Sequence, residues 1–357
     1  KGESDGGLCR RNLTYAAHHR RADGKDMVYF ASEGIDTNGS LVACRFDRET
    51  GGLEFVAQRD AGEKATCHVC VAPGGQHVLC ASYCGAVTAF PLEEDGTPGT
   101  SGDPLRLPLP PHRLLFAPFP RPHPRQDASH PHMCFFPPHS NTLLVTDLGL
   151  NIAYPLSYNP DDRLRCLDVG PPPGTRSEVL QGGGPRHMCV HPSLPVAYVL
   201  YELSSTLGVF SLLSNGSLSD GPIVPPVRTL PSDFSAFHGV PYGSDDRNTT
   251  AAIRMHPTGK FLYASNRVTY GEVEGQVSYF TLDAVTGVPT LCGVVSSRGK
   301  APRDIVLSPD GDILLVANQN SDNIVSFSVD LKTGSLQHRF TSDSTILSPV
   351  SLLPIPC

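Results

Sequence analysis

A short hydrophobic segment recurs along the chain, and each copy is followed by a turn and a second hydrophobic segment. The clear copies run into Pro73, Pro137, Pro192, Pro257 and Pro309, and a degraded earlier copy begins near residue 13. The second segments cover residues 28–32, 78–82, 143–146, 197–200, 261–265 and 313–317. Segments of four or five residues suit β-strands and are too short for most helices.

A third, alternating segment follows in several copies, over residues 87–90, 207–212, 277–282 and 324–329. The unit often continues into an Asp-x-x-Thr-Gly sequence, which occurs at residues 47–51, 283–287 and 330–334. Glycine there permits the positive φ of a hairpin turn. The pattern therefore predicts four antiparallel strands in each unit.

The repeat predicts how these units assemble. Successive copies lie 52 to 65 residues apart, and a four-stranded unit cannot bury its apolar face alone. Copies that stack around an axis form a β-propeller. We therefore expect an all-β fold, a seven-bladed β-propeller of four-stranded antiparallel blades. Residues 13–357 would form this single domain after an N-terminal extension over residues 1–12.

The last of the seven expected inner strands lies at residues 349–355, and only two residues follow it. Residues 1–12 are too few to supply its three partner strands, so we expect the first or last blade to be incomplete in this chain. The missing strands could lie upstream of Lys1, come from another chain, or be unnecessary in a ring of six blades. An incomplete blade would offer unpaired strand edges to a protein partner.

The composition of the chain indicates which classes of partner it can bind and in which cellular compartment it is found. A net charge of −7 disfavours a broad nucleic-acid surface. No stretch approaches the roughly 20 apolar residues that cross a bilayer, so we expect no membrane insertion. The 11 cysteines lack the dense spacing of a small disulfide scaffold, which favours a reducing, cytoplasmic compartment.

Polar residues occupy equivalent positions in several copies of the repeat. The inner strands of a propeller begin near one end of its axis, so residues at their starts and at the ends of the second strands should converge there. At the starts stand His68, His132, Arg186, His187 and Arg303. After the second strands stand Tyr83, Asp147, Glu202, Arg267 and Gln319. Strand ends can also carry charge for solubility alone.

Several of these positions lie in short motifs that resemble one family. The motifs are Asp147-Leu148-Gly149, Gly184-Pro185-Arg186-His187, Glu202-Leu203, Ser265-Asn266-Arg267 and Pro302-Arg303-Asp304. They resemble the seven-bladed propeller lactonases, which include the bacterial-type 6-phosphogluconolactonases and the fungal carboxy-cis,cis-muconate cyclases. The similarity runs from about Leu13 to Ile355. The family's opening strands have no counterpart before Leu13.

The resemblance implies that His132, Arg186, Glu202 and Arg267 are catalytic. His132 or Glu202 would act as general acid/base, while both arginines would bind an anion and stabilise the oxyanion. Residues that would bind substrate are His68, Tyr83, Asp147, His187, Arg303 and Gln319. Three alternatives stay open: Glu202 forms a structural salt bridge to Arg186, His132 is a hydrogen-bonded channel histidine, and Asp147 orients His132 or holds a turn.

We therefore expect a metal-independent lactonase with no cofactor, acting on a small anionic lactone, 6-phosphogluconolactone. A muconate cyclase-like enzyme and a non-catalytic scaffold in a larger assembly are the alternatives. The Cys67-His68-Val69-Cys70 sequence does not suggest a metal site, because residues i and i+3 of a strand face opposite sides. The Pro- and His-rich stretch over residues 110–132 is interpreted as an insertion between blades.

Overall fold

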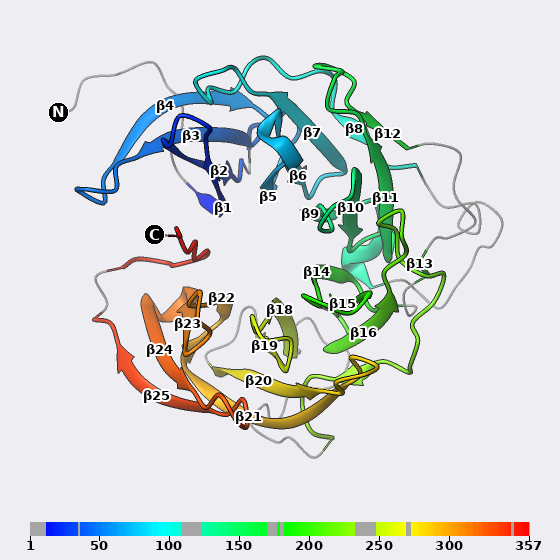
Figure 1. The fold of residues 1–357 in the computed structure, drawn as a ribbon, viewed down its shortest axis with the longest axis vertical. Coiled ribbons are helices and arrows are strands. Elements are labelled where there is room, and N and C mark those ends of the chain that lie inside the picture. The colour runs from blue at the N-terminus through cyan, green and yellow to red at the C-terminus, as the bar shows by residue number, and fades with distance from the viewer. Residues whose placement is uncertain are drawn as a thin grey trace.

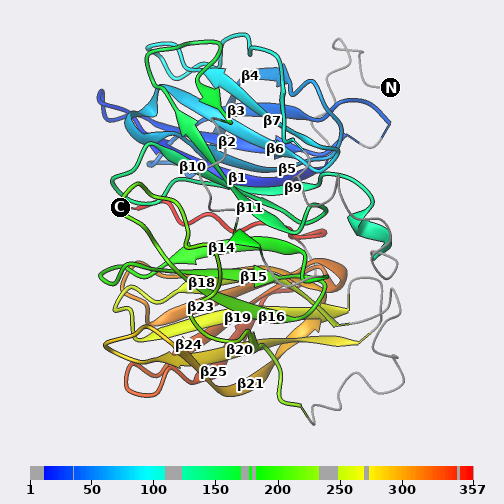
Figure 2. The ribbon, with the colours of Figure 1, turned by 90° about the vertical axis from the view of Figure 1, so that its right-hand side faces the viewer.

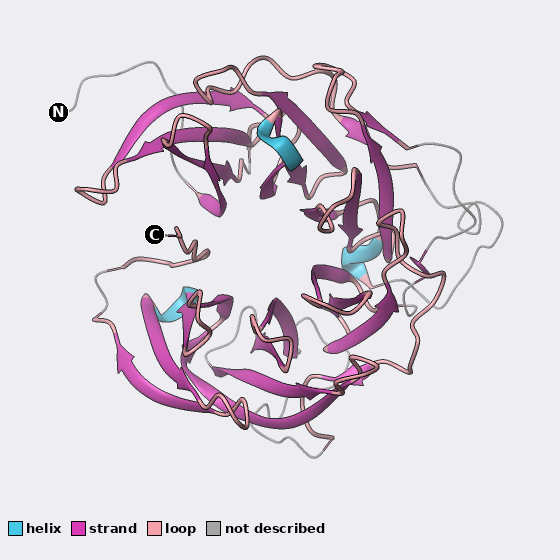
Figure 3. Cartoon of the chain, in the orientation of Figure 1, coloured by secondary structure: helices cyan, strands magenta, loops and turns pink. Residues whose placement is uncertain are grey.

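In the computed structural model, β-strands are the dominant regular secondary structure of the described residues, with turns and loops between them (Figure 3). Among the described residues, the short 3₁₀ turns are η1 (Pro73–Gly75), η2 (Pro124–Gln126) and η3 (Gln319–Ser321). The predicted all-β class is confirmed. The described residues are 12–34, 36–108, 123–169, 177–178, 182–232, 248–268, 273–343 and 346–356.

The described residues form six antiparallel sheets around a common axis, each with its first strand innermost (Figure 1). The first blade contains β1 (Leu13–Arg20), β2 (Asp26–Ser32), β3 (Ser40–Phe46) and β4 (Leu53–Asp60). The second contains β5 (Thr66–Val71), β6 (His77–Ser82), β7 (Ala86–Pro91) and β8 (Leu105–Arg106). The third contains β9 (Pro131–Phe135), β10 (Thr142–Asp147), β11 (Ile152–Tyr158) and β12 (Leu167–Asp168), and β13 (Ser177–Glu178) also pairs with β11.

The remaining blades follow the same order around the ring. The fourth contains β14 (Pro185–Val190), β15 (Val196–Tyr201), β16 (Thr206–Ser211) and β17 (Val227–Arg228). The fifth contains β18 (Asn248–Met255), β19 (Phe261–Val268), β20 (Glu274–Leu282) and β21 (Pro289–Lys300). The sixth contains β22 (Pro302–Leu307), β23 (Ile313–Asn318), β24 (Asn323–Val329) and β25 (Leu336–Thr341).

The second strand of each blade carries the most continuous hydrophobic sequence because both of its faces are covered. Strands β6, β15 and β19 are buried along their whole lengths. Neighbouring blades stack face to face (Figure 2), so that Leu144 of β10 and Val199 of β15 belong to one core cluster. Burial of apolar area between blades stabilises the ring.

The Asp-x-x-Thr-Gly sequences form the predicted turns. Their glycines, Gly51, Gly287 and Gly334, have φ of 70°, 69° and 74°, values that favour glycine. In the turn after β20, the Asp283 carboxylate accepts a hydrogen bond from the Thr286 backbone N–H at 2.8 Å. The side chain and the glycine together reverse the chain into the outermost strand.

A tyrosine on the second strand of three blades donates a hydrogen bond to a turn of the next blade. The bonds join the hydroxyls of Tyr29, Tyr198 and Tyr263 to the carbonyl oxygens of Gly96, Gly287 and Gly334, at 2.7, 2.7 and 2.9 Å. We call these three contacts the rim bonds. They connect consecutive blades.

An extended segment lies between the sixth and first blades, near the axis (Figure 1). Leu352 N donates to Asp304 Oδ2 at 2.9 Å, and Arg48 Nη1 donates to Pro356 O at 2.6 Å. Residues 349–355 thus lie where an inner strand of a seventh blade is expected, although the described residues of this segment form no strand ladder. The expected incomplete blade stays a prediction, and residues 1–11 of the expected extension lie outside the described residues.

Candidate active site

A bulge recurs at the start of the inner strands. In β9, Pro131 pairs with Asp147 and Met133 with Thr146, so the intervening His132 has no partner on β10. The same shift skips Arg186 in β14 and Arg303 in β22. A bulge adds one residue to a strand and re-aims side chains. Three of the predicted site residues therefore occupy the bulged position of their blades.

Glu202 is the centre of a buried cluster of charges. It follows β15 directly and is fully buried. Its Oε1 lies 2.6 Å from Arg125 Nη1 and 3.5 Å from Arg267 Nη2. Its Oε2 lies 2.9 Å from Arg186 Nε. The ion pair that the sequence suggested between Glu202 and Arg186 is therefore present, with two further arginines on the same carboxylate. We call these four residues the Glu202 cluster.

The charges in the Glu202 cluster perturb one another. Burial alone would raise the pKa of Glu202, but Arg125, Arg267 and Arg186 outweigh it and hold that pKa well below the usual range. Burial lowers the pKa of Arg267 to about 9 and also lowers that of Arg186, while Glu202 opposes both effects. At neutral pH the cluster holds three guanidinium groups and one carboxylate.

Imidazole rings lie beside the Glu202 cluster. His132 and His187 are buried, with ring centroids 5.6 Å apart, and His187 Nε2 lies 3.1 Å from Arg186 Nη1. His68 lies 5.8 Å from His187 and stacks on Tyr15 at 4.1 Å. Burial, reinforced by Arg186, lowers the pKa of His132 and of His187 well below 6.5. Both rings are therefore neutral at neutral pH.

Tyr83 places its ring at the edge of the same cluster. It follows β6, stacks on His130 at 4.3 Å, and lies edge-on to His132 with centroids 6.0 Å apart. Its hydroxyl accepts a hydrogen bond from Arg125 Nε at 3.1 Å. Burial raises the pKa of Tyr83, so the hydroxyl stays protonated and can donate in turn.

The other predicted site residues occupy two different environments. Arg303 Nη1 lies 3.4 Å from Gln319 Oε1, so these two residues form a pair on the sixth blade. The Asp147 carboxylate accepts hydrogen bonds from the backbone N–H groups of His130 and Leu150 at 2.7 and 2.8 Å. It thus holds the turn after β10 and the segment before β9, which is one of the roles considered from the sequence.

Two residues of this region, Arg125 and Arg254, could not be identified from the sequence. Arg125 lies in the insertion before β9, where the repeat gives no register. Arg254 donates to Asp304 Oδ1 at 2.8 Å and to the Tyr15 hydroxyl at 3.2 Å. The Pro302-Arg303-Asp304 motif marked Asp304, but no pattern in the sequence indicated its partner on β18.

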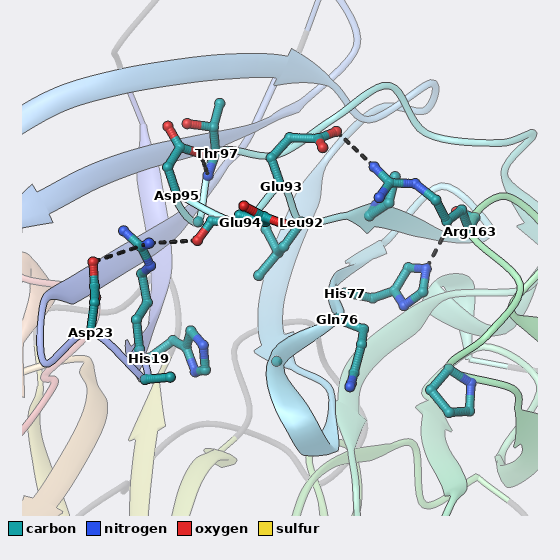
Figure 4. A pocket seen from close by; sticks show the side chains of 16 residues that line it. His19, Asp23, Gln76, His77, Leu92, Glu93, Glu94, Asp95, Thr97 and Arg163 are labelled. Carbon is teal, nitrogen blue, oxygen red and sulfur yellow. Dashed lines mark hydrogen bonds and ion pairs between the residues drawn. The ribbon is translucent and has the colours of Figure 1, made fainter.

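A surface cleft of about 1130 Å³ lies at the ends of the inner strands β1 and β5, whereas the Glu202 cluster lies near the starts of inner strands (Figure 4). Its lining includes His19 at the end of β1 and His77 at the start of β6. Glu93 and Arg163 form an ion pair of 2.7 Å in this lining, as Figure 4 shows. None of the residues predicted for the site lines this cleft.

The described residues contain neither a candidate metal site nor a membrane-spanning helix. No group of three or more His, Cys, Asp and Glu side chains there is arranged to hold a metal ion. No helix in the same part of the chain is long and apolar enough to cross a membrane.

The ring of four-stranded sheets defines a β-propeller. At one end of the propeller's inner strands, the Glu202 cluster contains more cations than carboxylates. The chain belongs to the lactonase family of seven-bladed β-propellers, whose model matches residues 12–353. Family membership makes it a lactone hydrolase and confirms the resemblance seen in the sequence.

The known proteins that are similar to this chain align with most of its length. A 6-phosphogluconolactonase of Bacillus subtilis is 29% identical over 326 residues, covering 91% of this chain and 82% of the relative. A 6-phosphogluconolactonase of Formosa agariphila is 27% identical over 316 residues, covering 88% and 81%. The crystal structure of a Lactobacillus plantarum protein, 27% identical, superposes with a TM-score of 0.77 over 97% of this chain and 89% of that chain.

Proposed function

We propose that the protein hydrolyses 6-phosphogluconolactone at the Glu202 cluster. The observation that carries this proposal is a buried site in which three guanidinium groups face one carboxylate beside a neutral imidazole. Such an excess of positive charge suits an anionic lactone. Two relatives that share most of the chain are named 6-phosphogluconolactonase, which supports this substrate.

Hydrolysis of a lactone needs a base, an acid and donors for an oxyanion. A water oxygen attacks the carbonyl carbon while the base takes one water proton, and the carbonyl oxygen becomes the oxyanion. When the oxyanion collapses, the bond between the carbonyl carbon and the ring oxygen breaks. The protonated base then gives its proton to the ring oxygen, which leaves as a hydroxyl group of the open-chain acid.

His132 is the stronger candidate for the base. Both oxygens of Glu202 are engaged by arginines, and the low pKa of this carboxylate makes it a weak proton acceptor. His132 is neutral, and its Nδ1 has no hydrogen-bond partner among the described residues. The nearby Glu202 carboxylate would stabilise the imidazolium that forms when His132 takes the proton.

The two buried arginines, Arg186 and Arg267, would stabilise the oxyanion. Arg267 Nε and Nη1 have no hydrogen-bond partner within the described part of the chain, so these N–H groups are available to a ligand. Arg186 is held by Glu202, His187 and the Ala251 carbonyl. A fixed guanidinium can stabilise developing negative charge without reorganising.

The remaining predicted residues would shape the substrate pocket. We assign His68, His187 and Tyr83 to its walls because their rings lie beside His132 or the Glu202 cluster. Arg303 and Gln319 would extend it toward the sixth blade. The buried Cys67, Cys80 and Cys134 form no disulfide, and such buried reduced thiols support a cytoplasmic location.

The test is an assay of the purified protein on freshly prepared 6-phosphogluconolactone. We expect hydrolysis faster than the spontaneous reaction, with His132→Ala and Arg186→Ala each reducing it strongly. Arg163→Ala, which removes an arginine from the distant cleft, is the matched control and should retain full activity. Wild-type protein that does not accelerate hydrolysis would contradict the proposal, and turnover of carboxymuconate instead would favour the muconate cyclase alternative.

A further inference from the structure

Arg125 differs from the other arginines of the Glu202 cluster in where its backbone lies. It belongs to η2, in the connection between the second and third blades, whereas Arg186 and Arg267 lie on strands β14 and β19. Its own N–H donates to His123 Nδ1 at 3.1 Å, and the neighbouring Gln126 side chain donates to Leu148 O at 3.0 Å. The short helix is therefore anchored, and the Arg125 side chain extends from it toward Glu202.

Solvent reaches only one of these three arginines to a substantial extent. The Arg125 side chain is 35% exposed, against 3% for Arg186 and 4% for Arg267. Arg186 also has contacts with the Ala251 carbonyl and His187 that would have to break before it could move. An incoming anion therefore meets Arg125 first.

The other contacts of Arg125 limit the directions in which it can turn. Its Nε donates to the Tyr83 hydroxyl at 3.1 Å, and its guanidinium carbon lies 5.8 Å from the centroid of the Tyr83 ring. Tyr83 could keep these contacts while Nη1 exchanges the Glu202 carboxylate for another anion. Guanidinium groups bind phosphate through paired N–H donors, which makes a phosphate an effective competitor.

Charge balance favours this exchange. The cluster holds two more positive than negative charges, and a phosphate monoester carries close to two negative charges at neutral pH. We propose that Arg125 recognises the phosphate of the substrate by leaving Glu202 for it. This inference rests on the proposed function, in which the substrate is a phosphorylated lactone.

The exchange would couple recognition to chemistry. Once Arg125 binds the phosphate, Glu202 keeps only Arg186 and Arg267 as partners. The Glu202 carboxylate, now neutralised by fewer cations, then stabilises the His132 imidazolium more strongly. The effect is large because both groups are buried, where charges are weakly screened. A lactone without a phosphate leaves Arg125 on Glu202 and gains no such assistance.

The experiment compares kcat/KM for 6-phosphogluconolactone with kcat/KM for unphosphorylated gluconolactone. Arg125→Gln should lower the ratio of these two values by about 10-fold or more, the effect of losing a charged hydrogen bond to phosphate. Arg125→Lys keeps the positive charge but lacks the paired N–H donors of the planar guanidinium, and it should lower the ratio less. Arg163→Gln, which removes a partly exposed, carboxylate-paired arginine far from the site, should leave the ratio unchanged.

Two results would overturn the inference. An equal loss on both lactones would make Arg125 only a positioning residue for Glu202, and an unchanged ratio would exclude it from phosphate recognition. If the wild-type protein hydrolyses neither lactone, the proposed function fails, and titration calorimetry with 6-phosphogluconate still tests Arg125. Binding at least about 10-fold weaker in Arg125→Gln would support phosphate recognition, and equal binding would refute it.

Discussion

Asp304 Oδ1 accepts a hydrogen bond from Arg254 Nη2 at 2.8 Å, across the interface between the sixth and fifth blades. The other oxygen of Asp304 accepts the backbone N–H of Leu352, and Arg254 also donates to Tyr15 on the first blade. One partly buried ion pair therefore connects three blades and the segment that follows the last blade.

Replacing Asp304 by Asn should destabilise the protein by about 2–3 kcal/mol, because Arg254 would lose its counter-charge in a largely buried position. Urea unfolding monitored by circular dichroism would measure the change. Asp161→Asn, at an exposed position, serves as the control and should change the free energy of unfolding by less than about 0.5 kcal/mol. Equal stability of Asp304→Asn and wild type would contradict the role assigned to this ion pair.

Asp26 should make the first blade sensitive to acid. Arg48 and His18 hold the pKa of this buried carboxyl well below 3.8, against the opposing effect of burial. A carboxylate with a lowered folded-state pKa contributes stability above its unfolded pKa and loses it as pH falls. The stability difference between wild type and Asp26→Asn should therefore be full at pH 7 and shrink below about pH 4. Urea midpoints measured from pH 7 to pH 2 would show whether the two curves converge.

Glu202→Gln should reduce both activity and stability. The amide cannot neutralise Arg186 and Arg267, which are almost fully buried, so we expect a loss of about 3–5 kcal/mol. Without the carboxylate the His132 imidazolium is less stable, and kcat should fall by about 100-fold or more. Steady-state kinetics at a temperature where the variant is folded would test the second effect. A variant with wild-type kcat would show that Glu202 serves only as a structural ion pair.

The dependence of kcat/KM on pH should report the state of His132. Burial lowers its pKa well below 6.5, and only the neutral imidazole can accept a proton. Activity should therefore stay constant as pH decreases through 6.5 and fall only at lower pH. Glu202→Gln should shift this fall to lower pH, because Glu202 favours the charged form of His132 and its loss lowers the His132 pKa further. Buffered assays between pH 4.5 and 8 would measure the shift.

The sequence was sufficient to place the strands because burial imposes a strong pattern on them. The segment predicted at residues 313–317 lies within β23, and the one at 78–82 lies within β6. The turn glycines were also predictable, since positive φ restricts the choice of residue. The resemblance to the family indicated Glu202 and Arg267, which the fold brings to one point.

Other features could not be predicted, for identifiable physical reasons. An extra residue in an antiparallel pair leaves no trace in the alternation of one strand, so the bulge at Arg186 was not visible. Arg125 lies in an insertion whose prolines and histidines have no period to which a register could be assigned. The ion pair between Arg254 and Asp304 joins residues 50 positions apart, and neither residue type alone indicates such a partner.

The rim bond from Tyr198 to Gly287 joins the fourth blade to the fifth. Arg186 projects from the fourth blade and Arg267 from the fifth, so the spacing of these two guanidinium groups depends on the angle at which the two sheets meet. The hydrogen bond from the Tyr198 hydroxyl thus helps to set the geometry of the proposed active site. Loss of this one contact between blades would therefore change the proposed active site without removing any of its side chains.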